Sequence, residues 1–281
     1  MPVPHQSGRV ASGDVSIHFR KLGSRGETPI LIVHGLSYFS YDWLDVGAAL
    51  GSDREVVAMD MRGFGDSTWS AQKDYSVASM AQDIVNVLDH LGWRRIVLIG
   101  HSMGGRSTTH VAAQHPGPVA GLALIDYTPE NAPAGSKRVT QIVANTPDRF
   151  ASVEDAMRYF GSNSRARFEA YLNADFGLKR DAYFRDQFRK LLEAGERPKL
   201  GVDMWQLIAE VRCPLLSMRG ARSDMYAAET KEKMKAANPR LQVVEVDAGH
   251  NIAGENAQVF LAAMRAFLAA LEAKSHAHER H

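Results

Sequence analysis

The stretch IVLIGHSMGG occupies residues 96–105. It starts with a run of four apolar residues, which indicates a buried strand. Ser102 follows between Gly100 and Gly104, and from Met103 onward the residues favour a helix. Glycines on either side of the serine leave room where the chain reverses so sharply. The predicted local structure is therefore a strand, a tight turn at Ser102 and a helix.

The spacing Gly100-x-Ser102-x-Gly104 is that of a nucleophile elbow, in which strained backbone holds a serine hydroxyl out at the carboxyl edge of a sheet. Because the predicted helix begins at Met103, its unpaired N–H groups and its dipole point toward the position of a developing oxyanion. The same five-residue match also occurs in ordinary Gly-Ser turns, but the strand before it and the helix after it favour an elbow. Ser102 is therefore predicted to be a nucleophile.

Alternating strand and helix patterns run through most of the chain. Residues 9–22 alternate apolar and polar side chains around Gly13-Asp14, which predicts a hairpin. Further strands are predicted at 30–33, 56–59, 96–99, 122–125, 215–220 and 243–246. Amphipathic segments between the strands predict helices. This alternation indicates an α/β fold with a doubly wound, mostly parallel sheet.

The pattern changes after the sixth predicted strand. Residues 128–207 show helical spacing and many aromatic residues, without a convincing strand. We therefore expect an all-helical cap at 128–207, an α/β core formed by 1–127 and 208–273, and a flexible polar tail at 274–281. Most of the aromatic side chains are expected to pack the core of the insertion, and a minority to line a substrate pocket.

A serine hydroxyl is a poor nucleophile until a base takes its proton, and the base needs a third group to orient it. His250 lies just beyond the last predicted strand, at the same carboxyl edge as Ser102. Two aspartates compete for the third position, since both follow strands: Asp126 ends the strand before the insertion, and Asp224 follows the strand at 215–220 by a short loop. We predict Asp224 as the acid and keep Asp126 as the alternative.

An oxyanion site needs two backbone N–H groups directed at the developing charge. One is predicted at Met103, directly after the nucleophile. The other is expected in the loop that follows the strand at 30–33, at Leu36.

These motifs resemble the α/β-hydrolase fold superfamily, and within it the serine-nucleophile, esterase-like group that carries a helical cap. The resemblance covers nearly the whole chain and rests on the elbow, His34-Gly35, Asp60-x-x-Gly63-x-Gly65-x-Ser67, Arg219-Gly220, Ser223-Asp224 and Gly249-His250. It implies an eight-stranded, mostly parallel sheet flanked by helices, with the cap inserted after strand 6. It also implies that the segment from Asp60 to Ser67 is a structural turn.

We expect a serine hydrolase that cleaves small, fairly apolar carboxylic esters or related acyl compounds through an acyl-enzyme on Ser102, without a metal or an organic cofactor. The same residues could serve C–C bond (diketone) hydrolysis, lactone opening, acyl transfer or cofactor-free perhydrolysis. Dehalogenases and epoxide hydrolases of this superfamily use an aspartate at the elbow, so the serine disfavours their chemistry. A non-catalytic ligand-binding receptor is disfavoured, because the serine, the histidine and an aspartate are all present.

The amino-acid composition indicates which kinds of binding partner to expect. The 281 residues are 45% hydrophobic and 23% charged, which is ordinary for a globular protein, and the formal net charge is +1. A balanced charge gives no electrostatic reason to expect a nucleic acid or an anionic membrane as a partner. The single cysteine, Cys213, fits a reducing compartment, and the N-terminal residues lack a signal pattern, so we expect a cytoplasmic protein. The expected partner is a small-molecule acyl substrate, and the expected state is a monomer or a homodimer.

Overall fold

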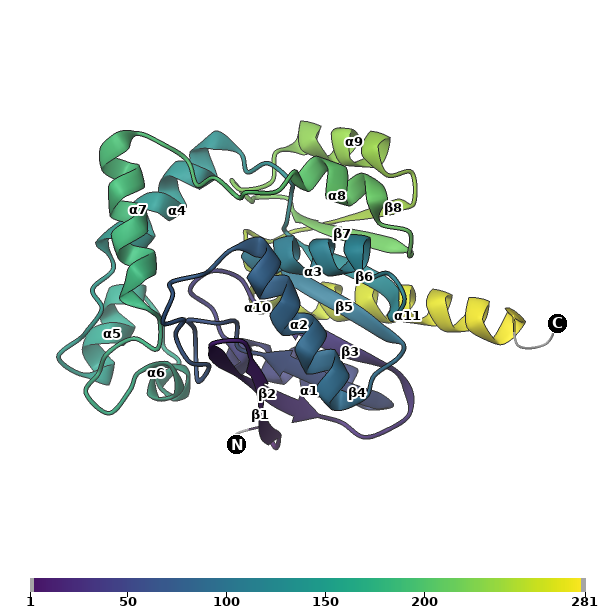
Figure 1. Ribbon diagram of the computed structural model, residues 1–281, viewed down its shortest axis with the longest axis horizontal. Helices are drawn as coiled ribbons and strands as arrows, with labels where there is room; N and C mark the ends of the chain where they lie inside the picture. Colours follow the sequence, from purple (N-terminus) through teal and green to yellow (C-terminus); the bar gives the residue numbers. More distant parts are fainter. Residues whose placement is uncertain (1–2, 279–281) are drawn as a thin grey trace.

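A computed structural model of the protein describes residues 3–278, with side chains up to Ala273. Its eight strands form one sheet in the order β1-β2-β4-β3-β5-β6-β7-β8 (Figure 1). The strands are β1 (Gln6–Ser12), β2 (Val15–Leu22), β3 (Glu27–Val33), β4 (Arg54–Met59), β5 (Ile96–His101), β6 (Val119–Ile125), β7 (Leu215–Gly220) and β8 (Leu241–Val246). β2 pairs antiparallel with β1 and β4, and every other pair of neighbours is parallel. The predicted eight-stranded, mostly parallel sheet is confirmed.

Helices cover both faces of the sheet. One face packs against α2 (Val77–Leu91), α3 (Met103–Gln114), α8 (Met204–Glu210) and α9 (Ala228–Ala237). The other face packs against the 3-10 turn η1 (Ser40–Trp43), α1 (Leu44–Leu50), α10 (Ile252–Glu255) and α11 (Ala257–His278). All six residues of β5 are buried, because this central strand has helices above and below it.

The helical spacing of the sequence explains how these layers form. In α2 the buried side chains include Met80, Ile84 and Val87, which recur at intervals of three and four residues and so share one face. Ser76 caps this helix by accepting a hydrogen bond from the backbone N–H of Ser79. The predicted amphipathic helix is therefore confirmed.

The chain between β6 and β7 forms five helices and a few isolated β-bridges but no named strand: α4 (Pro133–Asn145), α5 (Val153–Phe160), α6 (Arg165–Tyr171), α7 (Ala182–Ala194) and α8. Figure 1 shows α4 to α7 set to one side of the sheet, whereas α8 lies beside α3. Helices α5 and α6 share a small apolar core with Phe39 from the loop after β3. Since α8 ends three residues after 207 and packs on the sheet, it straddles the expected boundary between insertion and core.

The C-terminal helix is longer than expected. α11 continues to His278, so residues 274–278 of the expected flexible tail are helical, and 279–281 lie outside the described residues. Among the residues that the structure describes, no helix is long and apolar enough to cross a membrane.

Candidate active site

The turn at Ser102 joins β5 to α3 with φ 50° and ψ −115°, a conformation that is strained for a residue with a side chain. Its flanking glycines are required by close contacts. A Cβ at Gly100 would lie 2.1 Å from Oγ1 of Thr108, and a Cβ at Gly104 would lie 2.3 Å from the carbonyl oxygen of Val33. The predicted strand, tight turn and helix are present, and Ser102 borders a cavity.

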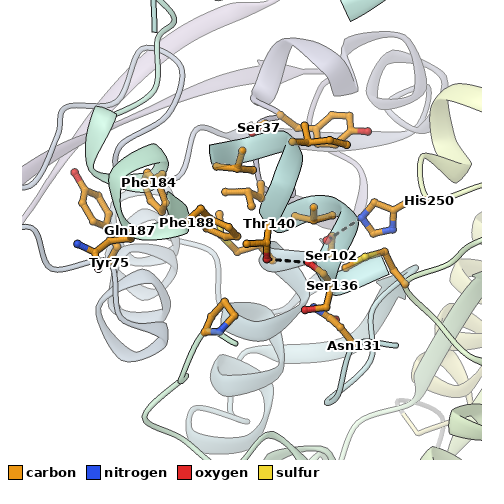
Figure 2. Close-up of a pocket in the computed structure, with 18 of the residues that line it drawn as sticks. Ser37, Tyr75, Ser102, Asn131, Ser136, Thr140, Phe184, Gln187, Phe188 and His250 are labelled. Atoms are coloured by element: carbon orange, nitrogen blue, oxygen red, sulfur yellow. Dashed lines mark hydrogen bonds between the residues drawn. The ribbon is translucent and has the colours of Figure 1, made fainter. Parts of the chain in front are cut away.

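Ser102, His250 and Asp126 form a continuous hydrogen-bonded chain. Oγ of Ser102 lies 2.9 Å from Nε2 of His250, and a dashed line in Figure 2 marks this hydrogen bond. Nδ1 of His250 lies 2.6 Å from Oδ2 of Asp126. Because a carboxylate only accepts hydrogen bonds, the ring carries its proton on Nδ1. Nε2 is therefore free to accept the hydroxyl proton of Ser102, which is the geometry of a general base beside a nucleophile.

Asp126 directly follows β6, is 2% exposed and has a φ of 43°, a left-handed conformation that turns its carboxylate along the sheet edge. Its Oδ1 accepts a hydrogen bond from the backbone N–H of Gly220 at 2.9 Å, and its Oδ2 accepts one from the hydroxyl of Ser223. The end of β7 thus supplies the polar contacts that a buried carboxylate needs.

The prediction that Asp224 orients His250 is wrong in this structure. Asp224 instead accepts hydrogen bonds from Nε and Nη2 of Arg138 in α4, at 2.6 and 2.7 Å, and its side chain is 37% exposed. The hydrogen bond from Arg138 lowers the pKa of Asp224. The physical reason lies in the loop of residues 221–223, which carries Asp224 past the sheet edge toward the insertion. Asp126 was the alternative, and it occupies the expected position.

Leu36 and Met103 both line the cavity at Ser102. Within the described part of the chain, no acceptor is hydrogen-bonded to the backbone N–H of either residue, so both amides are available to an oxyanion. The loop before Leu36 is held by His34, whose Nδ1 donates to the carbonyl of Gly35 at 2.7 Å and whose Nε2 accepts from the N–H of Met61 at 2.9 Å. Burial lowers the pKa of His34, which keeps Nε2 free to accept.

His101 is a neighbour of the site that sequence reasoning missed. Its Nε2 donates to the carbonyl oxygen of His250 at 3.0 Å, and the centroids of the two rings lie 4.9 Å apart. Burial lowers the pKa of His101 to about 3, so this ring stays neutral beside His250. His101 thus helps to position the loop that carries His250. Its place between Gly100 and Ser102 in the elbow was the only signal for it.

The cavity at Ser102 has a volume of about 1150 Å³. In Figure 2, α7 contributes Phe184, Gln187 and Phe188, α4 contributes Ser136 and Thr140, and Tyr75 comes from the loop before α2. The insertion therefore supplies much of the cavity wall opposite the sheet edge.

The side chains of His18, Asp60 and Asp66 offer ligand atoms within 4.8 Å of one another. However, Arg20 donates to both carboxylates, at 3.3 Å to Asp60 and 2.8 Å to Asp66. Asp60 also accepts a hydrogen bond from the backbone N–H of Ser40 at 2.6 Å. The cluster is thus an ion-pair network that fastens the segment after β4, as expected of a structural turn.

The family model described as the alpha/beta hydrolase fold matches residues 28–176, more than half of the chain. The chain belongs to the α/β-hydrolase fold family. Over 246 residues it is 30% identical to the 3-hydroxybutyrate-oligomer hydrolase of Cupriavidus necator, a match that covers 79% of this chain and 82% of that protein. It is 26% identical to the N-formylmaleamate deformylase of Pseudomonas putida, covering 93% of this chain and 96% of the relative.

Among solved structures, that of E-2-(acetamidomethylene)succinate hydrolase superposes with a TM-score of 0.81 at 25% identity, covering 94% of this chain and 99% of that one. Two of these three similar proteins are named as hydrolases and the third as a deformylase, and each covers at least 79% of this α/β-hydrolase, which supports hydrolase activity. The family predicted from the sequence motifs is confirmed.

Proposed function

We propose that this protein is a serine hydrolase that cleaves small carboxylic esters or related acyl compounds through an acyl-enzyme on Ser102. The observation that carries the proposal is the hydrogen-bonded chain from Asp126 through His250 to Ser102, which ends at a large cavity. Asp126 takes the place that we expected for Asp224. A complete relay of this kind argues against a non-catalytic ligand-binding receptor.

In this mechanism Oγ of Ser102 attacks the acyl carbonyl while Nε2 of His250 takes the hydroxyl proton. The amides of Leu36 and Met103 hold the resulting oxyanion. Asp126 keeps the ring in the required tautomer and stabilises the imidazolium. His250 then gives its proton to the leaving group, and a water molecule, activated by the same base, hydrolyses the acyl-enzyme and restores Ser102.

A second candidate is cleavage of a C–N acyl bond by the same steps, with nitrogen as the leaving atom. The observation that favours it is the near end-to-end match to a protein named N-formylmaleamate deformylase. C–C bond hydrolysis, lactone opening, acyl transfer and perhydrolysis would use the same oxyanion site.

A fluorophosphonate probe, read by intact mass, tests the nucleophile without knowledge of the substrate. We expect one adduct on the wild type, and no adduct on Ser102→Ala. Lack of labelling of a folded wild type, or labelling that persists in Ser102→Ala, would refute the assignment. A panel of matched 4-nitrophenyl esters and 4-nitroanilides then separates ester from amide cleavage.

A further inference from the structure

Arg106 lies on α3 one helical turn after Ser102, and its side chain borders the same cavity. Among the described residues, no carboxylate forms an ion pair with its guanidinium, and no acceptor is hydrogen-bonded to it. Burial lowers the pKa of Arg106, and the group that opposes this effect is the phenol of Tyr127 rather than a carboxylate. An arginine stays charged nevertheless, so this is a partly desolvated cation without a counter-ion.

The other arginines of the cavity differ from Arg106 in this respect. Arg138 is bonded to Asp224 through two nitrogens, and Nε of Arg167 lies 2.5 Å from Oδ1 of Asp42. Burial opposes the charge on Arg167, but Asp42 more than offsets it and raises the pKa of Arg167. The charge of a paired arginine is already neutralised by its carboxylate, so it attracts a ligand anion less strongly. Of the arginines that the described part of the chain places at this cavity, Arg106 is therefore the one available to an incoming anion.

The surroundings of Arg106 favour negative charge. A side pocket of about 80 Å³ opens between Arg106, Lys199 and the first turn of α2 at Ser76 and Val77. None of the described residues that line it is acidic, and Arg106 and Lys199 are basic. The carboxylate of Asp74 already accepts a hydrogen bond from the backbone N–H of Ser76 at the start of α2, so the attraction for an anion rests on the two basic side chains. Met103, whose amide is one of the two proposed oxyanion donors, borders the same side pocket.

We propose that Arg106 binds an anionic group of the acyl substrate, so that the site selects acyl compounds that carry a carboxylate close to the reacting carbonyl. This inference rests on the proposed function, because it places the reacting carbonyl at Ser102. Arg106 follows Ser102 by four residues, a rise of about 6 Å along the helix axis, so the carboxylate is placed only a few bonds from the carbonyl. The side pocket holds roughly two or three water molecules by volume, which suits a carboxylate and excludes a long acyl chain.

The test compares two esters of similar length, the 4-nitrophenyl monoester of glutaric acid, which is anionic, and 4-nitrophenyl pentanoate, which is neutral. The readout is the ratio of kcat/KM for the anionic ester to kcat/KM for the neutral one. We expect the wild type to prefer the anionic ester and Arg106→Met to lower the ratio roughly 10- to 100-fold, the range for loss of a charged hydrogen bond. Arg106→Lys keeps the charge and should retain part of the preference.

Two matched variants remove the same charge elsewhere. Arg94→Met acts at a side chain that is 83% exposed, and should leave the ratio unchanged. Arg138→Met removes a cavity arginine that is already paired, and should lower the ratio less than Arg106→Met. An unchanged ratio in Arg106→Met, or equal falls in Arg138→Met and Arg106→Met, would overturn the assignment to Arg106.

Glutarate binding, measured by calorimetry on Ser102→Ala, makes the test independent of turnover. We expect binding to Ser102→Ala and its loss in the double variant Ser102→Ala/Arg106→Met. Arg106-dependent binding in a protein whose wild type neither labels nor hydrolyses esters would refute the proposed function and leave the anion site standing. Labelling and ester hydrolysis without any preference for the anionic ester would refute the anion site alone.

Discussion

Nδ1 of His250 and Oδ2 of Asp126 lie 2.6 Å apart, although 124 residues separate them in the chain. The contact exists because β6 and β8 both end at the carboxyl edge of the sheet, with β7 between them. Asp126 is the first residue after β6, so its carboxylate stays at that edge.

Asp126→Asn should lower kcat/KM for any ester that the protein hydrolyses by roughly 10³- to 10⁴-fold, whereas Asp224→Asn should change it by less than about threefold. An amide at 126 can donate to Nδ1, which stabilises the wrong tautomer of His250. Asp224 contacts Arg138 rather than His250. Steady-state kinetics and the rate of fluorophosphonate labelling measure the difference, with circular dichroism as the check on folding. The reverse order of effects would mean that Asp224 is the acid.

Gly104→Ala should destabilise the fold by about 2 kcal/mol or more, because its Cβ would lie 2.3 Å from the carbonyl oxygen of Val33 and 2.5 Å from that of His34. Moving the backbone at the end of β3, or of the residue that follows it, would cost free energy because β3 lies in the middle of the sheet. Gly117→Ala is the matched control, since nothing lies within 4 Å of its added Cβ. Urea unfolding of the two variants compares them directly. Equal stabilities would contradict the tight contact at the elbow.

His101 should make the protein less stable as the pH falls. The folded protein keeps this ring neutral down to about pH 3, whereas the unfolded chain protonates it below about pH 6.5. Because the unfolded state binds more protons, the free energy of unfolding decreases from about pH 6.5 toward pH 3, by at most about 1.4 kcal/mol per pH unit.

In His101→Gln the contribution of this ring vanishes, so the free energy of unfolding should depend less steeply on pH than in the wild type. Urea titrations between pH 7.5 and 4.5 measure both slopes. Parallel curves for the two proteins would show that His101 is protonated in the folded state.

Asp181→Asn should destabilise the protein by about 1–3 kcal/mol, because the carboxylate connects the insertion to the core. Asp181 precedes α7 and caps it by accepting a hydrogen bond from the backbone N–H of Tyr183. Its carboxylate also accepts hydrogen bonds from Nζ of Lys73, at 2.7 Å, and from the hydroxyl of Tyr75. Asp186→Asn removes a half-exposed carboxylate from the same helix and should change stability by less than about 0.5 kcal/mol. Thermal unfolding of both variants measures the effect, and equal melting temperatures would contradict this tether.

The sequence by itself determined the features that depend on local spacing. The alternation of apolar runs and amphipathic segments sufficed for the sheet and its helices, because strands and helices repeat at periods set by the backbone. The elbow could be predicted in the same way. Wherever a strand turns this sharply into a helix, a side chain at the flanking positions would collide with nearby atoms, so glycine is required there. Leu36 and Met103 line the same cavity as Ser102, and their role as oxyanion donors stays a prediction.

Only the tertiary structure decided which aspartate faces His250 and which arginine lacks a partner. Asp126 and Asp224 both follow strands, so their sequence contexts are alike, and the path of residues 221–223 decides between them. Arg138 and Arg167 are paired with Asp224 and Asp42, whereas no carboxylate among the described residues contacts Arg106. Such choices depend on distances between segments remote in the chain, and local periodicity carries no information about those distances.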